Sequence, residues 1–343
     1  MSRSNYPKQF LDVLGTGKTL LQQTYDRFLH ICPKENIFIV TNSDYKDIVK
    51  EQLNDLFPEN ILLEPSRKNT APCIAYASYK IAKKNANAIT VVAPSDHLIL
   101  DDFAFKDAIH SCYKKAAGEN CLMTLGITPT RPDTGYGYIQ FKDPDKKEPD
   151  IKIKKVKTFT EKPDLDMAKS LLQSGDFLWN SGIFIWSVKS IIQAFEEYSP
   201  QLASSFSEGT EVYFTPAEND FIRRVYTDCK NISIDYAVME KASNVFVRVS
   251  DFGWSDLGTW SSLYEHINLD ENKNAIVGKH VMLYNTKNCI VNVPKNKLVL
   301  LQGLDGYIVV ESDNILLVCR KEDEQSIRIF VNDVKVSKGD KFV

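Results

Sequence analysis

The sequence has no strongly basic block, although it is rich in charge. Its 42 Lys and Arg against 45 Asp and Glu give a formal net charge of −3, and the positive charges are spread along the chain. Neutralising a nucleic-acid backbone requires clustered Lys and Arg. We therefore expect no nucleic-acid partner, and any bound anion must be held by a few individually placed cations.

Long apolar runs are also missing. No stretch is long enough to span a bilayer, and the first residues lack the charged-then-apolar layout of a signal peptide. The seven cysteines are odd in number, and no two lie at the spacing of metal ligands or of a redox pair. We expect a cytoplasmic protein with no membrane partner, in which the following cysteines are buried free thiols: Cys32, Cys73, Cys112, Cys121, Cys229, Cys289 and Cys319.

The length and composition indicate a folded protein of two parts. With 43% hydrophobic and 11% aromatic residues, the 343-residue chain can build a sizeable core, and its length favours one large domain plus a smaller one. We place the boundary in the polar stretch between Leu269 and Ala275, which gives domains at residues 1–270 and 275–343.

Short apolar runs alternate with helical patterns in the first third of the chain. Ile37–Val40, Ile61–Leu63 and Ala88–Val92 have the composition of buried strands, and helical patterns lie between them. Continuous apolar strands separated by helices indicate a parallel sheet that is covered on both faces. The expected fold class is therefore α/β, with a mostly parallel central sheet.

The pattern changes further along the chain. After Cys121 strands and helices are interleaved, and from about Ala275 the helical patterns stop. Short β-rich runs then recur at roughly even spacing, which favours a small β domain or β-solenoid. These runs are His280–Leu283, Cys289–Val293, Lys297–Leu301, Gly306–Val310, Ile315–Cys319 and Ile327–Val331.

Two aspartates stand out by their surroundings. Asp96 follows the Ala88–Val92 strand, and ligands of parallel sheets bind beyond the carboxyl ends of the strands. Asp256 lies among two glycines and two tryptophans in Gly253–Trp260, just before a helical pattern. A carboxylate at the strand end suits Mg²⁺, which takes one or two protein carboxylates and completes its shell with water and phosphate oxygens. Taken alone, each aspartate is also explained as a helix cap.

Two lysines are candidates for binding phosphate. Lys8 follows a proline that fixes the local backbone, and Lys162 comes at the end of a strand. Neither is specific by itself, because a solvated surface lysine explains each position equally well.

These residues belong to an ordered series of motifs. The series runs Tyr6-Pro7-Lys8-Gln9-Phe10; Glu64-Pro65 with Asn69-Thr70-Ala71-Pro72; Pro94-Ser95-Asp96-His97; Thr134-Gly135-Tyr136-Gly137-Tyr138-Ile139; Phe159-Thr160-Glu161-Lys162-Pro163; Trp179-Asn180-Ser181-Gly182-Ile183-Phe184; Ser233-Ile234-Asp235-Tyr236-Ala237-Val238-Met239-Glu240-Lys241; and Gly253–Trp260. Over nearly the whole chain it closely resembles the mannose-1-phosphate guanylyltransferases, the enzymes that make GDP-mannose.

The resemblance implies a Rossmann-like nucleotidyltransferase domain followed by a β-rich domain that helps to form a homodimer or to close the first domain. It implies transfer of GMP from GTP to mannose 1-phosphate, with release of pyrophosphate. By that likeness, Asp96 and Asp256 would hold the Mg²⁺ that neutralises the reacting α-phosphate. Lys8 would meet the triphosphate, and Lys162 the sugar phosphate.

The same likeness implies the binding residues of the two substrates. The loop at Asn69 and Thr70 would approach the nucleotide base. Asp235 and Glu240 would support the sugar side of the cleft. The mannose would be held by a set in which small residues permit close approach of the backbone to hydroxyls, namely Gly135, Tyr136, Gly137, Glu161, Asn180, Ser181 and Gly182.

The implied chemistry explains why no Ser-His-Asp or Cys-His pattern is found. The attacking phosphate oxygen is already ionised, so that neither a protein nucleophile nor a strong general base is needed. Charge neutralisation and in-line positioning are what the reaction requires.

The sequence departs from the family pattern at two places. The opening strand and the glycine-rich loop with its arginine are missing before Lys8, and only Ser2-Arg3-Ser4 matches the tail of that loop. Because such a loop binds phosphates through its backbone N–H groups, we expect a start assigned too late or a trimmed chain, and little or no activity if Met1 is the true start. At Arg67-Lys68 the family more often has glycine and then arginine, so the base preference is less secure than the reaction.

Two alternatives remain open. An enzyme of the same fold could use another nucleotide or another hexose 1-phosphate. A non-catalytic sugar-nucleotide-binding protein would explain the missing loop but not the two aspartates. A nicotinamide dehydrogenase is poorly supported, because no G-x-G-x-x-G follows a strand.

Overall fold

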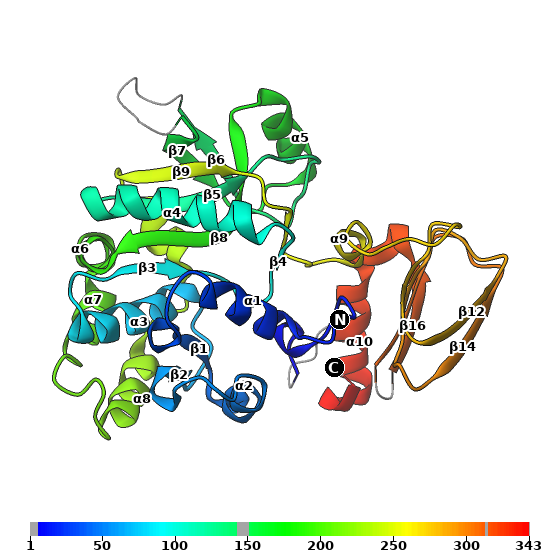
Figure 1. The fold of residues 1–343 in the computed structure, drawn as a ribbon, viewed down its shortest axis with the longest axis horizontal. Coiled ribbons are helices and arrows are strands. Elements are labelled where there is room, and N and C mark those ends of the chain that lie inside the picture. The colour runs from blue at the N-terminus through cyan, green and yellow to red at the C-terminus, as the bar shows by residue number, and fades with distance from the viewer. Residues whose placement is uncertain (1–5, 143–150, 313–314, 343) are drawn as a thin grey trace. The chain divides into compact units, whose positions relative to one another are not determined.

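A computed structural model describes residues 6–142, 151–312 and 315–342 (Figure 1). The chain divides into two compact units. The larger unit contains Tyr25–Ser95 and Ile99–Trp254, and the smaller unit contains the chain up to Thr24, Asp96–Leu98 and Ser255 onwards. The predicted boundary between Leu269 and Ala275 separates two continuous stretches of sequence, whereas each of these units combines separate stretches. The predicted boundary therefore stays a prediction.

The larger unit is built on a six-stranded sheet in the order β3-β8-β5-β9-β7-β6, with a separate parallel pair formed by β1 and β2. The alternation of strands and helices that defines an α/β protein is confirmed. The strands are β1 (Ile39–Asn42), β2 (Ile61–Glu64), β3 (Ile89–Val92), β5 (Leu122–Ile127), β6 (Tyr138–Phe141), β7 (Ile153–Thr160), β8 (Phe177–Ser187) and β9 (Val245–Ser250).

The strand directions differ from the expected mostly parallel sheet. Among the described pairings of the six-stranded sheet, β5 and β9 run parallel to each other. The other neighbouring strands run antiparallel. The sheet is therefore mixed. A continuous apolar run indicates burial on both faces and does not by itself determine strand direction, which is why the sequence pattern was misleading here.

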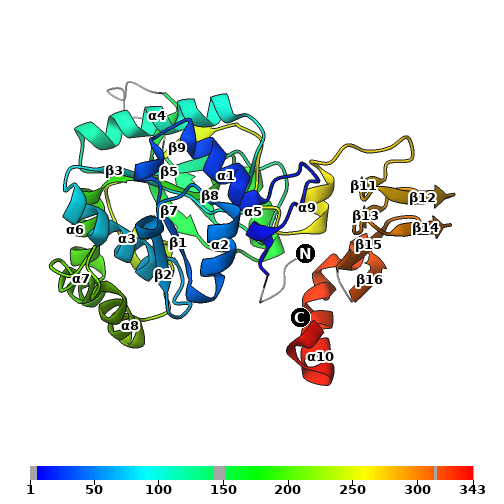
Figure 2. The same ribbon diagram turned by 60° about the horizontal axis from the view of Figure 1, so that its bottom comes forward.

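Helices cover both faces of this sheet (Figure 2). On β5, Met123 and Leu125 pack in a core with α4, whereas Leu122 belongs to a second core with α3, α6, α7 and α8. Two-sided burial is thus confirmed. The helices of this unit are α2 (Lys46–Gln52), α3 (Thr70–Lys84), α4 (Asp102–Gly118), α5 (Leu165–Ser174), α6 (Val188–Tyr198), α7 (Pro200–Ser207) and α8 (Glu218–Asp228); α1 (Leu20–Leu29) begins in the smaller unit.

Part of the sheet closes on itself. Strand β6 pairs with β8 as well as with β7, so that β8, β5, β9, β7 and β6 form a ring that we call the barrel. Ile139, Leu178 and Val247 form a buried apolar cluster inside it. Such a small barrel has room for side chains alone.

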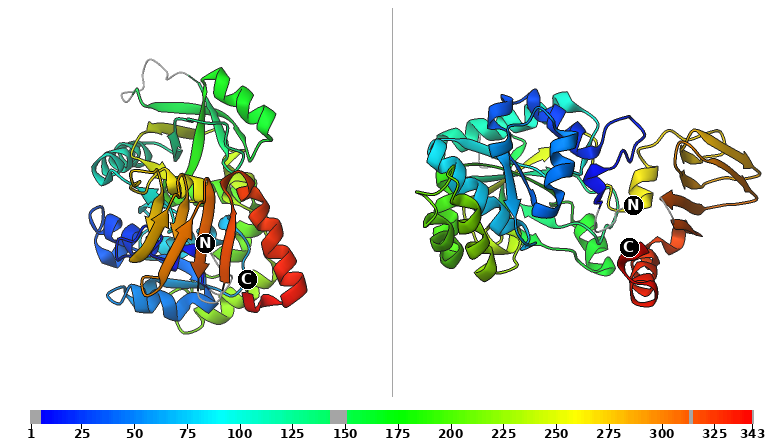
Figure 3. Two further views of the ribbon diagram at one scale, coloured as in Figure 1. Left: turned by 90° about the vertical axis from the view of Figure 1, so that its right-hand side faces the viewer. Right: turned by 90° about the horizontal axis from the view of Figure 1, so that it is seen from below.

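The smaller unit contains a short stack of parallel strands of the β-solenoid type, which we call the β-coil (Figure 3). Strands β11, β13 and β15 stack in parallel, β12 and β14 form a second parallel pair, and β16 runs antiparallel to β15. The expected β-solenoid-like region is confirmed. Its strands are β11 (Ala275–Val277), β12 (His280–Tyr284), β13 (Ile290–Asn292), β14 (Leu298–Gln302), β15 (Tyr307–Ser312) and β16 (Ile315–Arg320). The unit also includes the short helix α9 (Trp260–Tyr264), and β4 (Leu98–Ile99) and β10 (Trp254–Ser255) each contain a point where the chain passes between units.

The expectation that helices stop after Ala275 was wrong. Ile327–Val331, which was expected to be β-rich, begins helix α10 (Ile327–Lys338). Its β-branched residues favour a strand by local propensity, but Ile327 packs against the core of the smaller unit and the rest of the run stays largely exposed.

The cysteines match the expectation in part. All seven lie in the described residues and none forms a disulfide. Cys112, Cys121, Cys229 and Cys289 are buried as expected, whereas the other three are only half-buried. In the described residues, no helix has the length and apolar character needed to cross a membrane.

Candidate functional site

Lys8, Asp96 and Asp256 meet in the smaller unit. Pro7 precedes the short 3₁₀ helix Lys8–Phe10, whose Phe10 is buried and anchors the turn. The Lys8 ammonium lies 3.1 Å from Asp96 Oδ2 and donates to the backbone carbonyl of Asp256. Three residues that are distant in the sequence, and that were predicted to act on the triphosphate directly or through Mg²⁺, are therefore neighbours.

The alternative that these two aspartates cap helices was wrong. Helix α4 is capped by Asp101, and α9 is capped by Thr259, whose hydroxyl accepts from the Ser262 N–H in a capping box. The chain after Asp96 continues into β4 instead. Neither carboxylate is thus explained by a helix terminus.

A tight turn holds the Asp256 carboxylate. Leu257, fully buried, has a positive φ of 47°, and Asp256 Oδ1 accepts from the Gly258 N–H at 2.8 Å. A Cβ at Gly258 would lie 2.7 Å from Asp256 Oδ2. The glycine is therefore required for the backbone to approach the carboxylate this closely.

His97 lies beside Asp96, with 3.9 Å between Nε2 and Oδ1. Burial lowers the pKa of His97, and the Lys8 charge lowers it further, while Asp96 and Asp256 oppose the shift. The imidazole is accordingly disposed to be neutral and to act as a polar neighbour of the carboxylate.

The two carboxylates fit a magnesium ion by their chemistry. Among the described residues, no group of three His, Cys, Asp or Glu is placed to hold a metal. Mg²⁺ does not require one, because it binds through one or two carboxylates and keeps water and phosphate oxygens as its other ligands. Asp96 and Asp256 provide hard oxygen donors of this kind.

The motif at residues 179–184 forms a bulge in β8. Register with β5 changes between Thr124 paired to Phe184 and Gly126 paired to Asn180. The bulge is closed by Ser181, whose hydroxyl donates to the Leu125 carbonyl at 2.7 Å, and by Gly182 with a φ of +69°. Bulges of this type change the direction of a side chain, here that of Asn180.

Asn180 is held by several partners at once. Its Nδ2 donates to Asp235 Oδ1 at 2.9 Å, and its Oδ1 accepts from the Gly182 N–H at 3.2 Å and from the Thr124 hydroxyl at 3.3 Å. Its backbone N–H donates to the Gly137 carbonyl at 2.8 Å. Thr124 was not predicted from the sequence, because a threonine within a strand carries no distinguishing signal.

Acidic side chains gather around Asp235. Burial raises its pKa, and the negative charge of Glu161 adds to the rise, while Asn180 and Lys162 oppose it. The pKa of Glu240 is raised by burial, by Asp235 and by Glu161. Glu161, Asp235 and Glu240 are therefore close enough to influence one another.

Gly137 and Lys162 border the same acidic group. A Cβ at Gly137 would lie 2.6 Å from Glu161 Oε2, so glycine makes room for this carboxylate. Lys162 has a positive φ of 45°, and its ammonium lies 3.4 Å from Glu161 Oε1 while remaining largely exposed.

Gly135 and Tyr136 directly precede Gly137 in the chain. The Gly135 N–H donates to Asp133 Oδ1 at 2.8 Å. The Tyr136 ring is wedged edge-on between the rings of Trp179 and Trp254, with ring centroids 5.0 and 5.1 Å away. Tyr136 is buried, so it positions its neighbours rather than presenting a free face.

The loop before α3 is tied to the segment that precedes Asp235. Asn69 has a φ of 68°, its side chain accepts from the Thr70 N–H, and the Thr70 hydroxyl accepts from the Ile234 N–H at 2.9 Å.

Glu64, at the end of β2, accepts from the Tyr226 hydroxyl at 2.8 Å, and burial raises the pKa of this carboxyl group.

The predicted residues thus form two groups. Lys8, Asp96 and Asp256 meet in the smaller unit; the other predicted residues lie in the larger unit and are connected there through Asn180, Asp235 and Thr70. Ser2, Arg3 and Ser4, expected to be the tail of a phosphate loop, lie outside the described residues.

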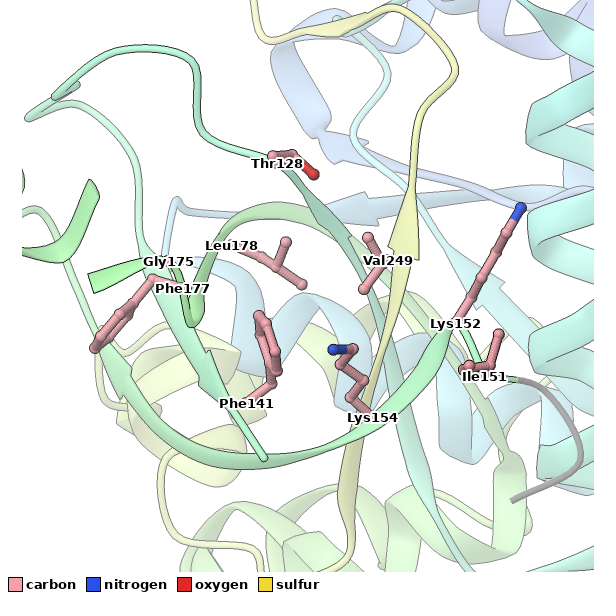
Figure 4. A pocket seen from close by; sticks show the side chains of 9 residues that line it. All are labelled: Thr128, Phe141, Ile151, Lys152, Lys154, Gly175, Phe177, Leu178 and Val249. Carbon is pink, nitrogen blue, oxygen red and sulfur yellow. The ribbon is translucent and has the colours of Figure 1, made fainter. Parts of the chain in front are cut away.

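A pocket of about 280 Å³ lies elsewhere in the larger unit, at one mouth of the barrel (Figure 4). Phe141, Leu178 and Val249 line its interior, with Lys154 at its edge. The Lys154 ammonium lies 4.0 Å from the centre of the Phe141 ring. None of the predicted site residues lines this pocket, so it is not the candidate site.

Known proteins match nearly the whole chain. The family described as Nucleotidyl transferase matches residues 1–273, and the MannoseP isomerase/GMP-like beta-helix domain matches residues 278–334. A mannose-1-phosphate guanylyltransferase of Escherichia coli is 35% identical over 98% of this chain and 73% of its own length. One from Salmonella montevideo is 37% identical over 98% of this chain and 71% of its own length.

Solved structures agree with this relationship. A Thermus thermophilus protein described as a mannose-1-phosphate geranyltransferase has a TM-score of 0.86 and 27% identity, covering 97% of this chain and 94% of that one. A mannose-6-phosphate isomerase from Helicobacter pylori has a TM-score of 0.62 and 28% identity, covering 74% and 96%. Sequence and fold therefore lead to one conclusion: the chain belongs to the nucleotidyl transferase family and, within it, to the mannose-1-phosphate guanylyltransferases.

Proposed function

We propose that this protein transfers the GMP group of GTP to mannose 1-phosphate. An oxygen of the sugar phosphate attacks the α-phosphorus of GTP, the bond to the bridging oxygen of the β-phosphate breaks, and pyrophosphate leaves with that electron pair. The products are GDP-mannose and pyrophosphate. The observation that carries the proposal is the meeting of Lys8, Asp96 and Asp256, in a chain that belongs to this family.

The reaction needs charge neutralisation rather than a protein nucleophile, because the attacking oxygen is already an anion. Lys8 is the cation assigned to the triphosphate, and Lys162 the cation assigned to the sugar phosphate. Asp96 and Asp256 would hold Mg²⁺, which supplies neutralisation of charge at the α-phosphate when it is bound. The tight turn at Gly258 keeps the Asp256 carboxylate in place for this role.

Recognition of mannose is assigned to the group around Asn180. Glu161, Asp235 and Glu240 offer acceptors for sugar hydroxyls, and Asn180 is fixed by Thr124 and Asp235. Gly135, Gly137, Ser181 and Gly182 keep the surrounding backbone free of bulky side chains. The base is assigned to the loop at Asn69 and Thr70.

The experiment that tests this function is a panel of nucleoside triphosphates and hexose 1-phosphates, with pyrophosphate release as the signal. GTP with mannose 1-phosphate is expected to give the highest kcat/KM. A higher value for another pair would assign the chain to a different nucleotidyltransferase reaction. Binding of GDP-mannose without turnover of any pair would make it a non-catalytic binding protein.

We also propose that the protein is cytoplasmic and that it forms a homodimer through its β-coil. The cysteines are all free thiols, as in a reducing compartment. On the outer side of the coil, Met282 and Leu300 are paired in register and are 45% and 57% exposed. Leu300→Lys should convert the dimer to a monomer in analytical ultracentrifugation, whereas a monomeric wild type would refute the proposal.

A further inference from the structure

Gly126 lies directly opposite Asn180 in the sheet. The two residues are register partners of β5 and β8, immediately beyond the bulge. Side chains of paired residues in antiparallel strands point to the same face, so the face that carries Asn180 also carries the missing side chain of Gly126. Leu178, two residues before Asn180 on β8, shares this face.

The space beside Gly126 is already filled. A Cβ at this position would lie 2.6 Å from Val247 Cγ2 and 2.7 Å from Leu178 Cδ1. Val247 and Leu178 are both buried in the interior of the barrel, at 0% and 3% exposure. A methyl group here would therefore displace one of these side chains, and Leu178 is the one that borders the pocket at the mouth of the barrel.

Leu178 connects this packing to the polar site. It is fixed on β8 by pairing with Ile139 on β6, and Asn180 follows on the same strand. A displacement of Leu178 therefore moves the strand on which Asn180 makes its bonds to Asp235 and Thr124. The apolar packing inside the barrel therefore affects the position of the polar side chains of the site.

We propose that Gly126 and Leu178 are positioning residues for the sugar subsite, acting through Asn180. The absence of a side chain at Gly126 lets Leu178 pack against Val247, and this packing sets where Asn180 and Asp235 present their polar atoms to the sugar. The inference rests on the proposed function for the identity of the sugar phosphate. It assigns sugar affinity partly to residues that do not touch the sugar.

Isothermal titration of the full chain with mannose 1-phosphate, and separately with GTP, tests the inference. Gly126→Ala should weaken mannose 1-phosphate binding about tenfold, as for loss of about one hydrogen bond, and leave GTP affinity within about twofold. The matched control is Gly118→Ala, because a Cβ at Gly118 has nothing within 4 Å. Its affinities for both ligands should equal those of the wild type.

Rescue distinguishes positioning from general damage. Val247→Ala added to Gly126→Ala removes the atom at 2.6 Å and keeps the Leu178 side chain, and it should restore sugar affinity to within about threefold of the wild type. If Gly126→Ala does not fold, the milder Leu178→Val should still weaken the sugar selectively. Unchanged sugar affinity in the folded variants, an equal loss for both ligands, or no rescue would overturn the inference. A wild type that binds GTP but not mannose 1-phosphate would instead overturn the proposed function.

Discussion

Lys162 is the exposed cation of the sugar side. Its ammonium lies 3.4 Å from Glu161 and is 64% exposed, so that it can turn to a sugar phosphate at little cost. Lys162→Ala should raise the KM for mannose 1-phosphate about tenfold through loss of a charge-assisted hydrogen bond, and leave the KM for GTP unchanged. Steady-state kinetics with each substrate varied in turn measures both values.

Lys169→Ala provides the matched control. Lys169 is another exposed lysine of the same unit, and it lies 3.3 Å from Asp166. This variant should have wild-type kinetics. A rise in the KM for GTP with Lys162→Ala, or equal effects of the two substitutions, would contradict the assignment of Lys162.

The raised pKa of Asp235 predicts that the stability of the protein depends on pH. Because burial and Glu161 raise its pKa, the folded state binds the proton more tightly than the unfolded state. The resulting stability is fully present below the unfolded pKa of about 4, and it is lost as the pH rises through the folded pKa. Asp235→Asn removes this loss and keeps the oxygen that accepts from Asn180.

Thermal unfolding across the pH range checks this expectation. At about pH 7 the Asp235→Asn variant should melt about 2 °C or more above the wild type, and the difference should vanish near about pH 4. A variant that is less stable than the wild type at neutral pH would show that the ionised carboxylate is stabilised instead.

At the level of single residues, much of the candidate site could be predicted. Lys8, Asp96 and Asp256 were named from composition and motif order, and the structure brings them together. The local pattern could not decide between metal ligand and helix cap, because both use an aspartate beside a helical pattern. Gly126 and Thr124 could not be found, since their importance depends on which residue lies across the sheet.

A buried ion pair joins two helices of the larger unit. Lys80 on α3 lies 2.7 Å from Glu218 on α8, and the Tyr76 hydroxyl also bonds Glu218, at 2.5 Å. Both charged side chains are nearly inaccessible, at 6% and 8% exposure. Glu218→Ala would leave Lys80 buried without this partner, and should lower the free energy of unfolding by about 3 kcal/mol.

The control is urea denaturation of a variant that lacks an exposed ion pair nearby. Lys83, also on α3, lies 3.5 Å from Glu211, whose side chain is 89% exposed. Glu211→Ala should have no measurable effect, because water screens and replaces exposed charges. Similar losses of stability in the two variants would mean that burial does not decide the strength of these pairs.

Elements were predictable where a pattern has one structural meaning. Helical patterns were expected between the first three strands, and α2 and α3 lie there. The bulge in β8 was not expected, because an Asn-Ser-Gly sequence fits an ordinary turn as well. Helix α10 was misjudged because the β-branched residues at its start favour a strand, and local propensity alone cannot reveal tertiary packing.

At the scale of the whole molecule, the fold class and the β-coil followed from the sequence, but strand order and direction did not. Which strands become neighbours depends on long-range pairing, and an example is the pairing of β5 with β9 more than a hundred residues later. The assembly of the smaller unit from separate stretches of chain was equally hidden, because Asp96 and Asp256 are distant in sequence.

The central claim is that this chain makes GDP-mannose with Asp96, Asp256 and Lys8. Its most direct test is GDP-mannose formation from GTP, mannose 1-phosphate and Mg²⁺, measured by chromatography for the wild type and for Asp256→Asn. The asparagine keeps Oδ1 to accept from the Gly258 N–H, so the melting temperature should be unchanged. The wild type should form GDP-mannose, and the variant should be at least about a hundredfold slower. Equal rates in the two proteins, or no GDP-mannose from the wild type, would contradict the account.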